Sequence, residues 1–171
     1  MDPATLAPTF PHAEIVVPAV ELRWWTQSGV DQIDLGPIRV GLARRIAATI
    51  AVWKNVRTFE PHGEIVPGVH AIPAYGHSPG HTAYLLASGN SQLFATADVS
   101  LNPALYLRHP HWQRALDQDP ATAVETRRRI FDRVVADKAF VTGTHWGLDN
   151  VGTIISDGNG YAFQPLAGRM G

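Results

Sequence analysis

The chain has 171 residues, 45% of them hydrophobic and 17% charged, a composition typical of one globular domain with its own core. The formal net charge is −1. Proteins that bind nucleic acids or anionic membranes usually carry an excess of cationic residues, so we expect neither as a partner. Because there is no cysteine, disulfides, thiolate zinc sites and a cysteine nucleophile are excluded.

The first part of the chain predicts strands separated by two helices. In chain order we expect a loop over 1–11, a strand over 13–18, a helix over 19–27, a turn-rich connection over 31–37, a helix over 38–53, and strands over 56–59 and 68–74. The helix over 38–53 rests on one apolar stripe that recurs every three or four residues: Ile38, Leu42, Ile46, Ile50 and Trp53.

The second part alternates strands with one clear helix. We expect strands over 82–86 and 92–97 around a turn at 88–90, an irregular segment over 102–119, a helix over 121–136, a strand over 138–142, and strands over 151–155 and 161–163 around a turn at 157–160. Asp119 and Pro120 start the helix, and its expected buried stripe is Ala123, Val124, Phe131, Val134 and Val135. The arginines at 127–129 are interpreted as a solvated helix face. This alternation indicates an α/β layered domain.

Three ligand-type side chains are expected at strand ends. His81 closes the sequence Gly-His-Ser-Pro-Gly-His at 76–81 and precedes a strand, whereas Asp98 follows the next strand. His145 comes after the strand over 138–142. Imidazole and carboxylate are ordinary ligands of zinc and similar ions, so these residues are candidates for a metal site.

The loop at 76–81, the Ala97-Asp98 pair and the late strand-end histidine resemble the metallo-β-lactamase-fold hydrolases. The resemblance covers nearly the whole chain, from residues 10–18 to the turn at 158–160, and is strongest to the lactonase and organophosphate-hydrolase branch. It implies an αββα sandwich and two zinc ions, the first bound by His81, the second by His145, and both bridged by a catalytic Asp98. The implied reaction is attack of a metal-activated water on a small-molecule ester, lactone or phosphoester.

One departure from the resemblance stands out, since the family motif His-x-His-x-Asp-His does not occur in the sequence. We therefore expect residues 1–171 to be a single domain of this fold, N-terminally truncated and missing its first strands and first metal motif. Such a chain should bind zinc weakly, have impaired activity, and self-associate through an exposed sheet edge. The alternative is a non-catalytic fold remnant that serves as a binding or assembly module; an upstream reading frame encoding the motif would favour the hydrolase.

The chain as written has no signal-like start and no long apolar run, so we expect a soluble, cytoplasmic protein unless an upstream segment carries a signal.

Among the other candidate side chains, His77 is expected to support a ligand rather than bind metal, and Trp146 to line the cleft. A substitute metal site at His109 and His111 is disfavoured because a proline separates them in a loop. A serine triad at Ser78 is disfavoured because Pro79 does not suit a nucleophile elbow.

Overall fold

The computed structural model describes residues 9–27 and 37–166, with the side chains of the second helix described from Val40 onward. By its internal contacts the chain divides into two compact units, Met1–Glu60 and Pro61–Gly171. The expectations for residues 1–8 and 31–36, and for the side chain of Ile38, lie outside the described residues.

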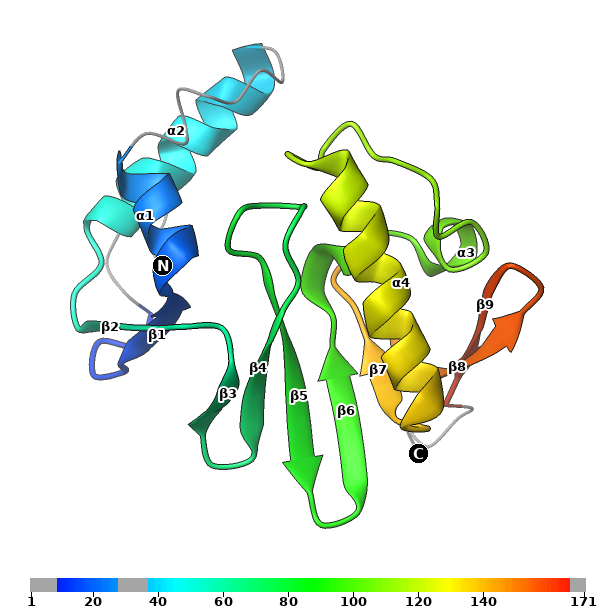
Figure 1. Ribbon diagram of the computed structural model, residues 1–171. Coiled ribbons are helices and arrows are strands. Elements are labelled where there is room, and N and C mark those ends of the chain that lie inside the picture. Colours follow the sequence, from blue (N-terminus) through cyan, green and yellow to red (C-terminus); the bar gives the residue numbers. More distant parts are fainter. Residues whose placement is uncertain (1–8, 28–36, 167–171) are drawn as a thin grey trace. The chain divides into compact units, whose positions relative to one another are not determined.

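The first unit contains one parallel pair of strands and two helices (Figure 1). Its elements are β1 (Ile15–Pro18), α1 (Ala19–Gln27), α2 (Pro37–Ala51) and β2 (Val56–Phe59). β1 pairs with β2 in parallel, and the helices form the crossover that a parallel pair requires. All four elements match the predicted ones. The expected buried stripe of α2 is wrong at Leu42, whose side chain is 59% exposed.

The second unit is built on one seven-stranded sheet with the strand order β3-β4-β5-β6-β7-β8-β9. The strands are β3 (Gly63–Val66), β4 (Val69–Pro73), β5 (Thr82–Ser88), β6 (Ser91–Ala95), β7 (Phe140–Thr142), β8 (Val151–Asp157) and β9 (Gly160–Pro165). Every neighbouring pair is antiparallel except β6 and β7, which are parallel. The sequence did not predict β3, nor the single-turn helix α3 (Pro103–Tyr106) inside the irregular segment.

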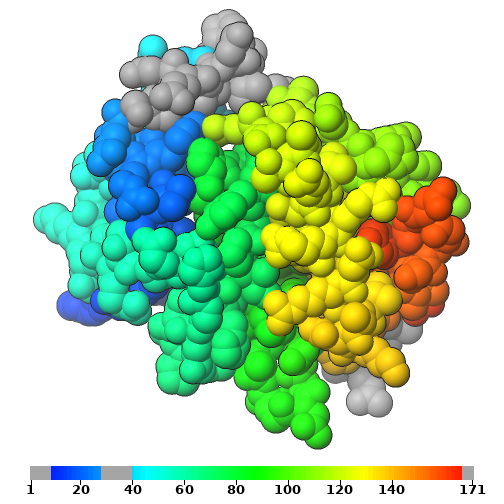
Figure 2. Space-filling model, viewed as in Figure 1, coloured from blue at the N-terminus to red at the C-terminus, as the bar shows by residue number. Residues whose placement is uncertain are grey.

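Helix α4 (Pro120–Ala136) makes the crossover between β6 and β7 and lies over one face of the sheet (Figure 1). Asp119 caps its first turn, because the carboxylate accepts a hydrogen bond from the backbone N–H of Thr122 at 3.0 Å. In the space-filling view α4 lies between the central strands and the β8–β9 hairpin (Figure 2). The core under the helix is apolar and includes Phe94, Val141 and Ile154 from the sheet with Ile130, Phe131 and Val134 from the helix.

The interpretation of the arginine triplet as a solvated face is wrong for Arg127. Its side chain is fully buried, whereas Arg128 and Arg129 are exposed. Arg127 is held by backbone carbonyls of the segment that precedes the helix, a set of partners that helical periodicity does not reveal.

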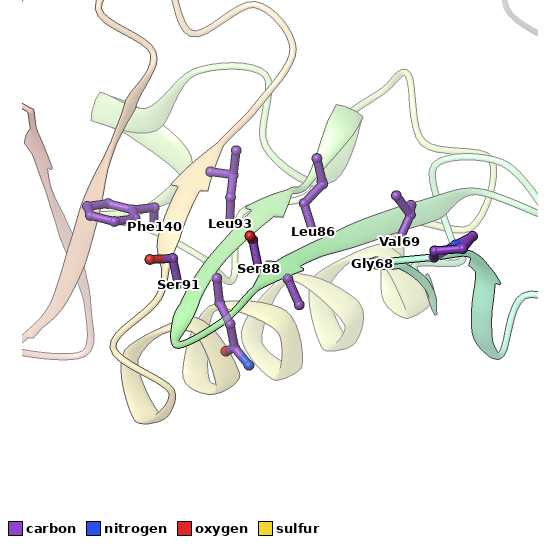
Figure 3. A pocket seen from close by; sticks show the side chains of 10 residues that line it. Gly68, Val69, Leu86, Ser88, Ser91, Leu93 and Phe140 are labelled. Carbon is purple, nitrogen blue, oxygen red and sulfur yellow. The ribbon is translucent and has the colours of Figure 1, made fainter.

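The opposite face of the sheet carries an apolar row that crosses five strands. The row follows the strand register, in which successive partners lie on the same face: Val66, Val69, Leu86, Leu93 and Phe140. A groove of about 350 Å³ runs along it, and Val69, Leu86 and Leu93 point away from α4 (Figure 3). The sheet is therefore covered by α4 on one face and presents open apolar side chains on the other.

Candidate metal-binding site at the strand ends

The parallel pairing of β6 and β7 brings the candidate residues Asp98 and His145 together. Carboxyl ends of parallel neighbours meet at one edge of a sheet, and Asp98 and His145 lie in the turns that follow these two strands. Two backbone hydrogen bonds fasten the turns: Thr96 N–H donates to the carbonyl of Thr142 at 2.8 Å, and Thr144 N–H to that of Ala97 at 3.2 Å.

Both turns contain a non-glycine residue in the left-handed region. Ala97, next to Asp98, has a φ of 49°, and His145 has a φ of 67°. Such conformations cost side-chain-bearing residues of order 1–3 kcal/mol and cluster at functional sites, where the surrounding structure enforces them. These two residues lie in neighbouring turns at the same edge of the sheet, which marks this edge as a candidate functional site.

The carboxylate of Asp98 is the centre of the site. Its Oδ2 lies 3.3 Å from Nε2 of His77, and its Oδ1 lies 3.7 Å from Nε2 of His145. Oδ1 is buried and has no hydrogen-bond partner. The hydrogen bond from His77 is the main reason that the pKa of Asp98 lies below its usual value, so the group is a carboxylate anion at neutral pH.

His77, which the sequence suggested as a supporting residue, faces the carboxylate directly. Its Nε2 points at Asp98, and its Nδ1 lies 3.0 Å from Oδ1 of Asp117. Burial lowers the pKa of His77, but the hydrogen bonds to Asp117 and Asp98 outweigh this effect and raise the pKa to about 9. With its pKa above neutral, His77 is a cation at pH 7 whose two nitrogens donate to the carboxylates of Asp117 and Asp98.

His81, the ligand suggested by the resemblance, contacts backbone atoms with both ring nitrogens. Nδ1 lies 2.8 Å from the carbonyl of Ala74, and Nε2 accepts the backbone N–H of Asp98 at 3.2 Å. In this structure His81 therefore fixes the backbone of Asp98.

Asp117 is a residue of the site that the sequence reasoning missed. Its side chain is fully buried and lies between the side chains of His77, Arg114 and Arg127. Nε of Arg114 donates to its Oδ2 at 2.9 Å, and the terminal nitrogen of Arg114 donates to its Oδ1. Burial opposes ionisation of Asp117, but the hydrogen bonds from His77 and Arg114 outweigh it and lower its pKa. The only sequence signal was the placement of Arg114 three residues before Asp117.

The aromatic candidates lie elsewhere in the second unit. Trp146, expected in the cleft wall, is a buried core side chain whose indole N–H donates to the carbonyl of Ser100 at 2.6 Å. His109 stacks on Trp112 with ring centroids 4.2 Å apart, and His111 packs edge-on to His109 at 6.1 Å. These two histidines belong to an aromatic cluster.

The donor chemistry at Asp98 fits a divalent cation. The buried, unpartnered Oδ1 of Asp98 is the strongest indication, because such an oxygen ordinarily has a partner. The number of donors is low, however: within residues 9–27 and 37–166, no cluster of three or more His, Cys, Asp or Glu side chains is arranged to hold a metal ion. The described residues therefore do not form a complete metal-binding cluster around Asp98.

Comparison with solved structures identifies the fold. AidC, a dizinc quorum-quenching lactonase, superposes with a TM-score of 0.79 at 21% identity, over 91% of this chain and 55% of its own. The hydrolase AbOPH of the β-lactamase superfamily superposes with a TM-score of 0.79 at 22% identity, over 92% of this chain and 56% of its own. The chain has the metallo-β-lactamase fold.

A third structure with the metallo-β-lactamase fold is more distant. It is an N-acyl homoserine lactone hydrolase with its product at the catalytic metal centre, with a TM-score of 0.57 at 21% identity, over 79% of this chain and 48% of its own. No protein-family model matches the sequence, and no curated protein matches it in sequence. The chain spans about half the length of AidC and AbOPH. Among the described residues, no helix has the length and apolar content to cross a membrane.

Proposed function

We propose that this chain carries part of the metal site of a metallo-β-lactamase-type hydrolase, centred on Asp98. One observation carries the proposal: Oδ1 of Asp98 is buried without a hydrogen-bond partner and lies 3.7 Å from the imidazole of His145. A buried anionic oxygen is costly unless it is paired or coordinates a metal, and a divalent cation between these two groups would supply the missing partner.

The site geometry favours His77 over His81 as the second histidine ligand. His77 directs Nε2 at the carboxylate of Asp98, whereas both nitrogens of His81 contact backbone atoms. We assign His77, Asp98 and His145 as the metal-facing residues, with Asp98 as the bridging and catalytic carboxylate. His81 takes a supporting role, in which it orients the backbone N–H of Asp98.

A zinc ion at such a site lowers the pKa of a bound water and polarises a carbonyl or phosphoryl oxygen. The residues of this chain would hold the zinc ion and the water bound to it. The side chains of His77 and Asp98 are 24% and 28% exposed, whereas the side chain of His145 is 62% exposed, so the site is most open on the His145 side. The substrate class proposed is a small ester-type molecule such as a lactone or phosphoester, supported by the lactonase and hydrolase character of the structurally similar proteins.

Metal affinity of the isolated chain should be low. Zinc sites usually have three or four protein ligands at bonding distance, and the described residues do not form such a cluster. We therefore propose weak zinc binding and impaired hydrolysis for the chain alone. The alternative function, a binding or assembly module, is favoured by one observation, the apolar row on the open sheet face.

A calorimetric zinc titration tests the proposal. The wild-type chain should bind zinc weakly, and Asp98→Asn, which keeps the shape of the side chain but removes its charge, should weaken binding at least about tenfold. Asp137→Asn is the matched control, because the side chain of Asp137 forms an exposed pair with Arg133 at 3.2 Å. Zinc binding that is unaffected by Asp98→Asn would contradict the metal site. A lactone or phosphotriester assay on the zinc-loaded protein then separates the hydrolase from the non-catalytic module.

A further inference from the structure

A buried charge cluster of Arg114, Asp117 and Arg127 lies next to the candidate site. The three side chains are 3%, 0% and 0% exposed, respectively. Two nitrogens of Arg114 donate to the carboxylate of Asp117, and Arg127 lies 3.7 Å from its Oδ2. Buried ions are tolerated only where opposite charges and hydrogen bonds offset the loss of water. Within this cluster, however, two cations share a single carboxylate.

Each of the two arginines also has a buried nitrogen that lacks a hydrogen-bond partner. Arg114 donates from Nε and Nη2 to Asp117, and from Nη2 to the backbone carbonyl of Asp98 at 2.7 Å, which leaves Nη1. Arg127 donates from Nε and Nη1 to three backbone carbonyls, which leaves Nη2. Buried N–H groups without an acceptor are rare and costly, above all on a charged group.

Tyr106 places both guanidinium groups beside the same ring. The Cζ atoms of Arg114 and Arg127 lie 5.6 Å and 5.1 Å from its centroid. The ring face attracts cations but carries no net charge to balance them. Burial, and then the like charge of Arg114, lower the pKa of Arg127 to about 10, and the attraction of Asp117 and Tyr106 offsets only part of this effect. The cluster thus lacks both a negative charge and acceptors for two nitrogens.

We propose that this cluster binds one small monovalent anion, chloride or an ion of similar size, at Nη1 of Arg114 and Nη2 of Arg127. Such an ion would accept hydrogen bonds from both nitrogens and balance the second cation, whereas a water molecule would do only the first. Because both side chains are almost fully buried, the site would exclude a molecule of substrate size. Arg114 belongs to the irregular segment and Arg127 to α4, so the ion would join these two parts of the fold. The inference does not depend on the metal site.

The dependence of stability on chloride tests the anion site in the full chain. Urea unfolding is measured in mixtures of sodium chloride and sodium gluconate at constant ionic strength, which keeps the screening of surface charges constant. An ion that binds only the folded state stabilises it by mass action, so each tenfold rise in chloride above its dissociation constant should raise the folding equilibrium constant about tenfold. A wild-type stability that does not change with chloride overturns the site.

Two arginine variants test where the ion binds. Arg114→Gln removes one cation together with Nη1 and leaves one cation facing one carboxylate, so the dependence on chloride should disappear. Arg128→Gln removes an exposed charge next to Arg127 and should keep the full dependence. A dependence that persists in Arg114→Gln overturns the assignment to this cluster.

Bromide locates the ion directly and decides the question if Arg114→Gln does not fold. Crystals of the wild-type protein are grown with sodium bromide in place of sodium chloride, and anomalous scattering reveals where bromide binds. A peak beside Nη1 of Arg114 and Nη2 of Arg127 supports the inference, and the absence of a peak at this place overturns it.

Discussion

At the scale of single residues, the structure shows which groups the two histidines of the Gly-His-Ser-Pro-Gly-His loop contact, whereas the assignment of His81 as a metal ligand stays a prediction. Spacing shows that His77 and His81 lie four residues apart, but it does not show which backbone groups compete for their nitrogens. In the fold His81 lies at the start of β5, where it contacts the Ala74 carbonyl and the Asp98 N–H. His77 is left facing the carboxylate. Only the folded geometry distinguishes the two.

His77 gives the metal-free protein a pH-dependent stability. Its pKa is about 9 in the folded protein and 6.5 in the unfolded chain, so protonation favours the folded state. The contribution, at most about 3 kcal/mol at 1.36 kcal/mol per pKa unit, is complete below pH 6.5 and disappears as pH rises through 9. Urea unfolding at pH 6 and pH 10 should show this fall for wild type and a smaller fall for His77→Gln. Equal pH dependence of both proteins would contradict the His77 contacts.

At the scale of elements, much of the second unit could be predicted from sequence. Helix α4 has a capping aspartate, a proline at its first position and a periodic stripe, and each hairpin has its own turn residues. The sequence did not predict β3, because this strand is short and its pairing with β4 is interrupted by a bulge between Glu64 and Val66. Arg127 was misplaced because charged residues are rarely buried, and its partners come from a distant, irregular segment.

Burial of Arg127 leads to a stability prediction. Arg127→Met removes three hydrogen bonds to carbonyls and leaves Asp117 with fewer countercharges, so unfolding free energy should fall by about 3–5 kcal/mol. Arg128→Met changes the exposed neighbour on the same helix and should cost no more than about 0.5 kcal/mol. Chemical denaturation compares the two variants. Equal stabilities would refute the anchoring role of Arg127.

The contact between the His77 loop and α4 depends on Gly76. Gly76 has a φ of 116°, and a Cβ there would lie 2.3 Å from the backbone nitrogen of Ala123. Gly76→Ala should therefore cost more than about 2 kcal/mol and displace His77. Gly89 also has a positive φ, 56°, but its Cβ would meet open space, so Gly89→Ala should cost only about 1 kcal/mol. Thermal melts of both variants measure the difference in stability. Equal losses of stability would contradict the close approach of Gly76 to Ala123.

At the scale of the whole molecule, the open sheet face of the second unit predicts self-association. The face carries the apolar row from Val66 to Phe140, and apolar patches that cross several strands commonly mark interaction surfaces. Leu86 lies in the middle of the row and is 40% exposed. The wild-type chain should therefore form oligomers as its concentration rises.

Light scattering coupled to size exclusion measures this association. Leu86→Lys should shift the protein toward the monomer, because it places a charge in the apolar row. Leu105→Lys, at a residue of α3 that is 45% exposed, is the control and should leave the association unchanged. A wild-type monomer at every concentration would show that the open face does not drive self-association.

The candidate site joins four separate parts of the chain, at residues 77, 98, 117 and 145. Sequence patterns located three of them, because the loop glycines and strand ends around His77, Asp98 and His145 are visible locally. They could not locate Asp117, since its role arises only when the irregular segment folds back on the loop at 76–81.

The most direct test of the metal site is a zinc titration followed by nitrogen-15 NMR of the histidine rings. We predict that the signals of Nε2 of His77 and Nε2 of His145 shift as zinc is added, while both nitrogen signals of His81 keep their metal-free positions. A zinc-dependent shift of His81 with His77 unchanged would contradict the proposed role of His77 and support the ligand assignment suggested by the sequence.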